Sequence, residues 1–251
     1  MSPLSKSERV PLLCCVTDQR SLGSTGTSEA RQPFHAHKLL LEKIAAAAAA
    51  GVDWIQIREK DLSGKECCSL TCQAMQLAAR SSSGGTAKVS ALPTSEGARE
   101  LVSARILVND RLDVALATQA GGVHLGEKSL PPEEARRLVR SLHCEKDFLI
   151  GVSCHSLETV KAAERGGADY VFFGPVFATP SKAAYGTPRG LDRLAEVCNA
   201  VAVPVLAIGG ITLENAADCL SAGASGIAAI RLFQEAPDMA AVVRAFRKLS
   251  A

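Results

Sequence analysis

Residues that could do chemistry follow directly on an apolar run in the middle of the chain. The run Ile106–Val108 has the character of a buried strand, and it ends in an amide, a carboxylate and a guanidinium: Asn109, Asp110 and Arg111. A buried strand ordinarily ends in turn residues, whereas these groups bind anions and divalent cations. A second apolar run, Gly122–Leu125, follows soon after. A binding site is therefore expected where these strands end.

Cationic, amide and hydroxyl side chains also stand at the ends of other apolar runs. Gln56, Arg58 and Lys60 occupy alternate positions, so a strand there would place all three on one side. Because charge-assisted hydrogen bonds to phosphate are strong, these cations predict a polyphosphate clamp, completed by Lys182, Asn109, Thr179 and Ser181. Asp110 beside such a clamp predicts a divalent ion, Mg²⁺, that bridges to phosphate oxygens.

Two further groups stand at the ends of later runs. Ser153 and His155 alternate at the end of a fifth run, and His155 is a candidate for proton transfer. Gly209-Gly210 and Ile230-Arg231 follow the last two runs. They predict a second anion site, since backbone N–H groups often bind a phosphate at such positions.

Each of these residues, taken alone, also has a purely structural interpretation. Arg58 could form a buried ion pair, Asp110 could cap the next helix, and His155 could be a hydrogen-bonded core histidine. Ser129 could likewise cap a helix, since two prolines follow it closely. The gathering of the whole set at strand ends favours an active site over these alternatives.

The elements that must position these residues alternate regularly along the chain. Short apolar runs are separated by helical patterns, and the predicted strands are 11–18, 52–60, 105–110, 121–126, 148–155, 168–177, 203–211 and 225–233. Strands that alternate with helices imply parallel βαβ units, and eight of them close into a single (β/α)8 barrel, the TIM barrel. In that α/β fold the strand carboxyl ends form the active face. An open doubly wound sheet is the alternative.

Composition narrows the class of protein. The 251 residues are 47% hydrophobic but only 4% aromatic, so aliphatic side chains build the core, which favours parallel α/β packing over an all-β sandwich. The net charge of +2 argues against bulk binding of nucleic acid. No apolar run approaches the ~18 residues of a membrane span, so no membrane partner is expected.

One domain is expected. Residues 1–9 form a flexible N-terminus and 10–251 the barrel, with a Ser/Gly-rich surface insertion near 80–97. The polar N-terminus lacks the apolar segment of a signal peptide. The nine cysteines lack zinc-ligand spacing, and most are expected to be reduced packing residues, which predicts a cytoplasmic protein. The oligomeric state, including a homo-oligomer, is left open.

Four stretches together resemble the thiamine phosphate synthase / TenI family. They are QIREK, VNDRLDVALATQAGGVHLG, IGVSCHSLETVKAAERGGADYVFFGPVFATPSK and PVLAIGGITLENAADCLSAGASGIAAI. The resemblance covers about residues 10–235, apart from the loop after the first strand and the insertion. It implies a (β/α)8 barrel. In the synthase branch it implies a transferase that joins hydroxymethylpyrimidine pyrophosphate to thiazole phosphate, giving thiamine phosphate and pyrophosphate.

The resemblance also implies roles for individual residues. Asp110 would bind Mg²⁺, and Ser153 would lie near the reacting pyrimidine. Gly210 and the backbone at Ile230-Arg231 would bind the thiazole phosphate. The pyrophosphate end would be held by Gln56, Arg58, Lys60, Asn109 and Lys182, with Thr179 in a flexible loop.

Two positions depart from the family pattern. The synthases usually carry a second Mg²⁺ ligand, an aspartate, in a stretch like HLGQEDL, whereas this chain has HLGEKSL and places Ser129 there. A serine is a poor substitute for a carboxylate, and Glu127 is the alternative source of charge. After the eighth strand, Arg231 stands where a serine is common, so its guanidinium could bind the phosphate or block the backbone cradle.

These departures keep two alternatives open. TenI-like thiazole tautomerases share the barrel and use a histidine at the position of His155, and a non-catalytic binder of thiazole phosphate would turn nothing over. An isomerase needs no pyrophosphate clamp, so Arg58, Lys60 and Lys182 favour the synthase. Ser129 favours the tautomerase.

Overall fold

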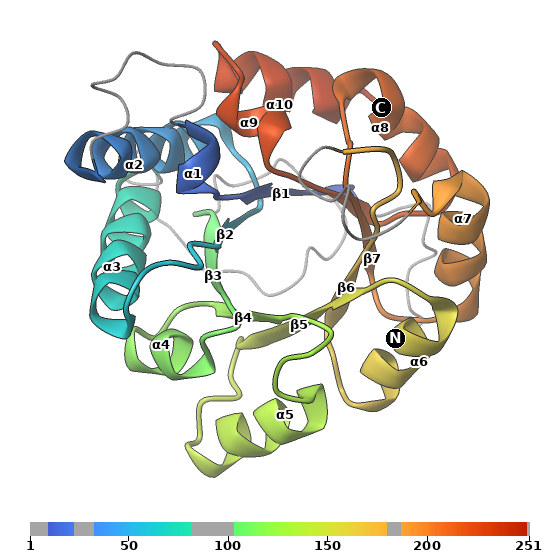
Figure 1. The fold of residues 1–251 in the computed structure, drawn as a ribbon, viewed down its shortest axis with the longest axis horizontal. Helices are drawn as coiled ribbons and strands as arrows, with labels where there is room; N and C mark the ends of the chain where they lie inside the picture. The colour runs from blue at the N-terminus through green and yellow to red at the C-terminus, as the bar shows by residue number, and fades with distance from the viewer. Residues whose placement is uncertain (1–9, 23–32, 82–102, 180–186, 250–251) are drawn as a thin grey trace.

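Eight parallel strands form a closed barrel (Figure 1). The computed structural model describes residues 10–22, 33–81, 103–179 and 187–249. Each strand pairs with the next, and β8 pairs with β1. The strands are β1 (Leu12–Val16), β2 (Trp54–Ile57), β3 (Arg105–Asn109), β4 (Gly122–Leu125), β5 (Leu149–Cys154), β6 (Tyr170–Phe173), β7 (Val205–Ile208) and β8 (Gly226–Ala229). The predicted (β/α)8 TIM barrel is confirmed, and the open sheet is excluded.

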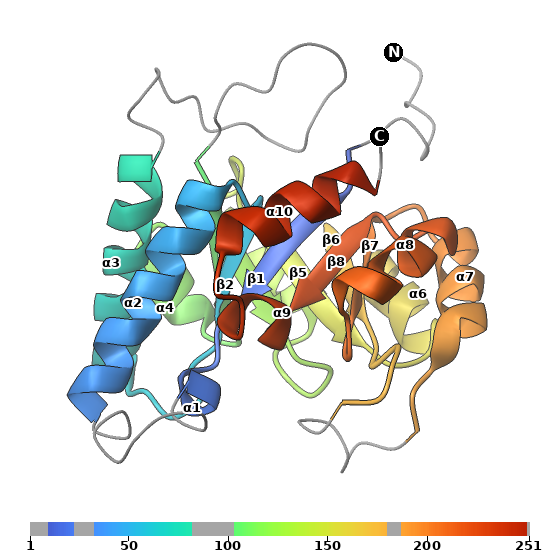
Figure 2. The same ribbon diagram turned by 90° about the horizontal axis from the view of Figure 1, so that it is seen from above.

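Helices form a ring around the strands (Figure 1). They are α1 (Gln19–Leu22), α2 (Pro33–Ala50), α3 (Gly64–Ser81), α4 (Leu112–Ala117), α5 (Pro132–Ser141), α6 (Leu157–Arg165), α7 (Gly190–Ala200), α8 (Leu213–Ser221), α9 (Arg231–Gln234) and α10 (Met239–Lys248). α1 follows β1 and lies at the lower edge of Figure 2, the end of the barrel where the strands finish. Among the described residues, no helix has both the length and the apolar character needed to cross a membrane.

The strands end earlier than the sequence predicted, and at β2 and β8 this changes the surroundings of candidate site residues. β2 stops at Ile57, so Arg58 and Lys60 lie in the following turn and do not continue a strand with Gln56. The cause is Thr17, whose hydroxyl accepts the Arg58 backbone N–H at 2.9 Å. β8 stops at Ala229, and the predicted continuation through 230–233 turns into α9, which buries Phe233 completely.

α3 also extends into the start of the predicted insertion. α3 runs on through Arg80 and Ser81, where the Ser81 hydroxyl donates to the Leu77 carbonyl at 3.1 Å. The rest of the 80–97 segment and the N-terminal residues 1–9 lie outside the described residues.

The inside of the barrel is packed with side chains, as the alternation along strands requires. One buried cluster fills it: Leu12, Cys14, Val16, Trp54, Leu107, Tyr170, Phe172, Leu206 and Ala228. The intervening residues, such as Leu13 and Cys15, pack outward against the helices. The aromatic rings of Trp54 and Tyr170 lie 4.6 Å apart at the centre of this cluster.

All nine cysteines are free thiols, as predicted, and most are buried. Burial raises the pKa of Cys15, Cys154 and Cys219 to about 12, so these thiols stay protonated and unreactive. Cys72 and Cys144 are exposed.

Gly151 provides a test of the packing inside the barrel. A Cβ there would lie 2.0 Å from Cζ of the buried Tyr170 ring. We expect Gly151→Ala to lower the free energy of unfolding in urea by about 2–4 kcal/mol, because the ring cannot move without displacing its neighbours. Gly64→Ala is the control, since its Cβ would meet only the mobile end of Arg111. Equal stability of the two variants would contradict this description of the core.

Candidate active site

A row of hydrogen-bonded polar side chains crosses the carboxyl ends of β2 and β3. Gln56 is buried, and its Nε2 donates to Asn109 Oδ1 at 2.8 Å. Asn109 Nδ2 in turn donates to Asp110 Oδ2 at 2.7 Å. The oxygen of the Gln56 side-chain amide, Oε1, is buried and accepts no hydrogen bond within the described part of the chain. A buried acceptor without a donor is costly, so this oxygen is suited to a donor from a ligand.

Asp110 directly follows β3 at this end of the barrel. Its backbone has φ of 60°, a left-handed conformation that few non-glycine residues adopt outside turns and functional sites. Oδ1 accepts the Gly126 backbone N–H at 2.8 Å and the Ser129 hydroxyl. α4 begins at Leu112 and its N-cap is Arg111, which makes no side-chain cap hydrogen bond. The alternative that Asp110 caps a helix is therefore wrong.

Ser129 and Glu127 take different places in the loop after β4. Ser129 contacts Asp110 through its hydroxyl and also accepts the Gly126 N–H at 3.0 Å. The Glu127 carboxylate instead lies 3.9 Å from Nε2 of His155. Ser129 is therefore the neighbour of Asp110, as its sequence position suggested, and Glu127 is the neighbour of His155.

Arg58 follows β2 at the same end. Its guanidinium lies 4.0 Å from Asp18, at the outer limit of an ion pair, and about a quarter of each side chain is exposed. Such a pair contributes little to stability, which makes a purely structural role for Arg58 unfavourable. Lys60 is exposed in the same turn.

His155 is half-buried at the end of β5. Its Nδ1 contacts the Gly174 carbonyl, which can only accept, so Nδ1 carries the proton. Nε2 then faces Glu127 as an acceptor when the ring is neutral and as an ion-pair donor when it is protonated. His155 is thus bonded at one nitrogen and open at the other.

The loops after β6, β7 and β8 meet at one side. Arg231 donates to the Thr179 hydroxyl at 3.2 Å, and Asn215 Nδ2 donates to the Gly210 carbonyl at 2.9 Å. Gly210 has φ of 68°, and a Cβ there would lie 2.6 Å from the Ala178 carbonyl, so the close approach needs glycine. Ile230 is half-buried and precedes α9. The predicted Ser181 and Lys182 lie outside the described residues.

Two further residues of this end, His124 and Glu59, were not predicted as site residues. His124 on β4 is 1% exposed and bonds the Ser153 hydroxyl through Nε2 at 2.9 Å. Glu59 lies between the two predicted cations and accepts the Gln19 N–H at 2.8 Å. Its other oxygen is buried and has no partner among the described residues, and burial raises the pKa of Glu59 above the ordinary 4.5. The sequence signal was its place in the QIREK stretch.

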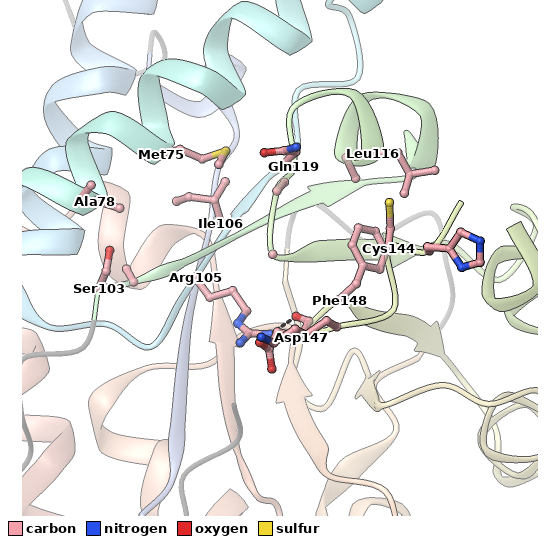
Figure 3. A pocket seen from close by; sticks show the side chains of 17 residues that line it. Met75, Ala78, Ser103, Arg105, Ile106, Leu116, Gln119, Cys144, Asp147 and Phe148 are labelled. Atoms are coloured by element: carbon pink, nitrogen blue, oxygen red, sulfur yellow. Dashed lines mark hydrogen bonds between the residues drawn. The ribbon is translucent and has the colours of Figure 1, made fainter. Parts of the chain in front are cut away.

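A cavity of about 480 Å³ lies at the other end of the barrel, beside the amino-terminal ends of β3, β4 and β5 (Figure 3). Met75, Ile106 and Phe148 make its lining largely apolar, and Arg105 donates to the Asp147 carbonyl at 2.6 Å beside it. Barrel enzymes act at the opposite, carboxyl-terminal face. The cavity is therefore not the candidate active site.

Comparison with known proteins places the chain in a family. The model of the family described as thiamine monophosphate synthase matches residues 28–233. The chain belongs to this family. It is 42% identical over 191 residues to the thiamine-phosphate synthase of Methanospirillum hungatei, covering 71% of this chain and 90% of the relative. It is 34% identical over 255 residues to that of a Roseiflexus species, covering 99% and 92%.

A solved structure agrees with the fold. The thiamine phosphate pyrophosphorylase of Pyrococcus furiosus matches with a TM-score of 0.71 and 28% identity, over 98% of each chain. The resemblance expected from the four sequence stretches is thereby confirmed at the level of family and fold.

Glu59 makes the stability of the protein depend on pH. Because its pKa is raised in the folded state, the folded chain binds this proton more tightly than the unfolded chain. The contribution is present below the ordinary pKa and is lost as the pH rises through the raised value. The variant Glu59→Gln keeps an acceptor for the Gln19 backbone N–H, but its amide side chain does not titrate.

In urea titrations, we expect the free energy of unfolding of the wild type to fall relative to that of Glu59→Gln as the pH rises above the ordinary value of 4.5. The exposed variant Glu235→Gln is the control. Parallel pH profiles for the wild type and Glu59→Gln would show that burial does not hold the proton.

Proposed function

We propose that the protein is a thiamine-phosphate synthase. It joins hydroxymethylpyrimidine pyrophosphate to thiazole phosphate and releases thiamine phosphate and pyrophosphate. Membership of the family supports this activity. The structural observation that carries it is the hydrogen-bonded row from Gln56 through Asn109 and Asp110 to Ser129. This row lies at the same end of the barrel as the turn after β2 that bears Arg58 and Lys60.

The residues present fit a Mg²⁺ ion held together with substrate. Mg²⁺ is usually bound by one or two carboxylates, with waters and phosphate oxygens completing its shell. Asp110 supplies one carboxylate and Ser129 a hydroxyl beside it. Among the described residues, no group of three or more acidic, histidine or cysteine side chains could hold a metal alone. When bound, the ion would neutralise charge on the pyrophosphate.

The chain's own cations stabilise the leaving group. Arg58, Lys60 and Lys182 hold the pyrophosphate, with Gln56 and Asn109 binding beside them. As the bond between the pyrimidine methylene carbon and the pyrophosphate oxygen breaks, negative charge gathers on that oxygen, and fixed cations lower the barrier. The thiazole nitrogen uses its lone pair to form the new bond to carbon. That nitrogen carries no proton, so no general base is required.

The second substrate is held by the loops after β6, β7 and β8. Gly210, with its left-handed backbone, and the backbone at Ile230-Arg231 bind the thiazole phosphate. The Arg231 guanidinium adds a charged donor, steadied by its bond to Thr179, and Ser181 lies in the same loop sequence. Holding both substrates in line converts the coupling into a reaction within one complex.

A coupling assay with Arg58→Ala tests this function. Purified wild type, Mg²⁺ and both substrates should yield thiamine phosphate, and EDTA should abolish the product. We expect Arg58→Ala to lower kcat/KM at least about 100-fold while the circular dichroism and melting temperature stay the same, because its ion pair is weak. Arg137→Ala, which removes an exposed guanidinium from α5, is the control. Coupling by Arg58→Ala at the wild-type rate would contradict the clamp.

Ser129→Asp tests the metal site. A second carboxylate beside Asp110 should lower the Mg²⁺ concentration for half-maximal rate about tenfold and raise the rate at limiting Mg²⁺. Ser129→Ala controls for loss of the hydroxyl. A Mg²⁺ dependence that is the same in all three proteins would place the ion elsewhere.

His155 distinguishes the synthase from a tautomerase. Its open Nε2 beside Glu127 is the arrangement that proton transfer would need. If the protein is a synthase, His155→Ala should only weaken coupling. Loss of nearly all activity on a thiazole carboxylate phosphate, with no coupling by the wild type, would move the assignment to the tautomerase.

A further inference from the structure

Three polar side chains from adjacent strands form a row that leads from the barrel interior to its mouth, the end where the carboxyl ends of the strands open. Tyr170 of β6 bonds Nδ1 of His124 through its hydroxyl at 3.1 Å, and Nε2 of His124 bonds the Ser153 hydroxyl at 2.9 Å. Tyr170 and His124 are 0% and 1% exposed, whereas Ser153 is partly exposed. Ser153 is therefore the end of the row that a substrate can reach.

Close packing fixes the geometry of the two buried rings. The Phe172 ring lies 4.1 Å from that of His124, and Trp54 lies 4.6 Å from that of Tyr170. Gly151, opposite His124 in the strand register, leaves room for Tyr170 only because it has no side chain. The His124 ring thus cannot turn over without displacing aromatic neighbours.

The Tyr170 hydroxyl fixes which nitrogen of His124 carries the proton. Burial raises the pKa of Tyr170 well above its ordinary 10, so the phenol keeps its proton. Within the described residues, Nδ1 of His124 is the acceptor that this proton reaches. Leaving a buried O–H without an acceptor is costly, so Tyr170 donates and Nδ1 accepts. The proton of neutral His124 then lies on Nε2, which donates to Ser153.

We propose that Tyr170 and His124 are positioning residues that make Ser153 a hydrogen-bond donor at the mouth of the barrel. Its oxygen accepts from Nε2, and its own proton turns toward the substrate. This rests on the proposed function. Ser153 then directs its proton to an unprotonated ring nitrogen of the pyrimidine.

The position of the proton can be measured without activity. In protein labelled with ¹⁵N-histidine, a ring nitrogen without a proton resonates far downfield of one that carries it. The signals of His124 are those missing from His124→Gln. We expect Nε2 of His124 to be protonated and Nδ1 bare, and we expect Tyr170→Phe to remove this preference. A proton on Nδ1 in the wild type would overturn the proposal, even if the protein is an active synthase.

A double-mutant cycle tests the effect on substrate. Tyr170→Phe should raise KM for hydroxymethylpyrimidine pyrophosphate about tenfold with little change in kcat, because the contact is made on binding. Added to Ser153→Ala, it should have no further effect. Equal effects of Tyr170→Phe in both backgrounds would overturn the proposal. Trp54→Phe, which alters packing against the Tyr170 ring, should lower stability without raising KM.

A conservative variant separates positioning from folding. His124→Gln can place an amide N–H near the site of Nε2 and should keep most of the wild-type KM, whereas His124→Ala should match Ser153→Ala. If His124→Gln and His124→Ala fail alike while both melt at the wild-type temperature, donation to Ser153 is not the role of His124.

Discussion

Hydrogen bonding between β1 and β8 closes the sheet, and the whole mouth depends on that closure. The pairing requires a close approach, since a Cβ on Gly226 would lie 2.0 Å from the Leu12 carbonyl. Because the strands of the closed barrel are parallel, their carboxyl ends all open at one face. Thr17, after β1, holds the turn of Arg58, and Arg231, after β8, reaches the loop after β6, so the pairing of β1 with β8 brings these two parts to the same mouth. Residues far apart in sequence become one site.

The mouth is built to be completed by a ligand that carries both hydrogen-bond donors and negative charge. Its centre is a row of amide and carboxylate groups bonded to one another, and the acceptor of Gln56 has no partner within the described residues. Arg58 is only weakly paired, so it loses little when a phosphate replaces Asp18 as its partner. Beneath this polar layer, aromatic packing fixes the orientation of the Tyr170 and His124 rings. The rigid interior thus supports the groups that bind substrate.

Local pattern predicted much of this molecule, and contacts between strands decided the rest. Alternating strands and helices predicted the barrel, and residue order predicted that Asn109 and Asp110 lie at the carboxyl end of a strand. Both signals are local. The end of β2 could not be predicted, since it depends on the hydroxyl of Thr17, which follows β1. The same holds for the loop after β4, where Glu127 turns to His155 and Ser129 to Asp110. Period two places His124 and Tyr170 inside the barrel but does not say that they bond.

The central claim is that the mouth binds pyrophosphate and Mg²⁺ together, and calorimetric titration with pyrophosphate tests it most directly. The wild type should bind pyrophosphate at least about tenfold more tightly with Mg²⁺ than with EDTA, and Asp110→Asn should lose that difference while keeping its fold. Equal affinity of the wild type with and without Mg²⁺, or no binding in its presence, would contradict the account.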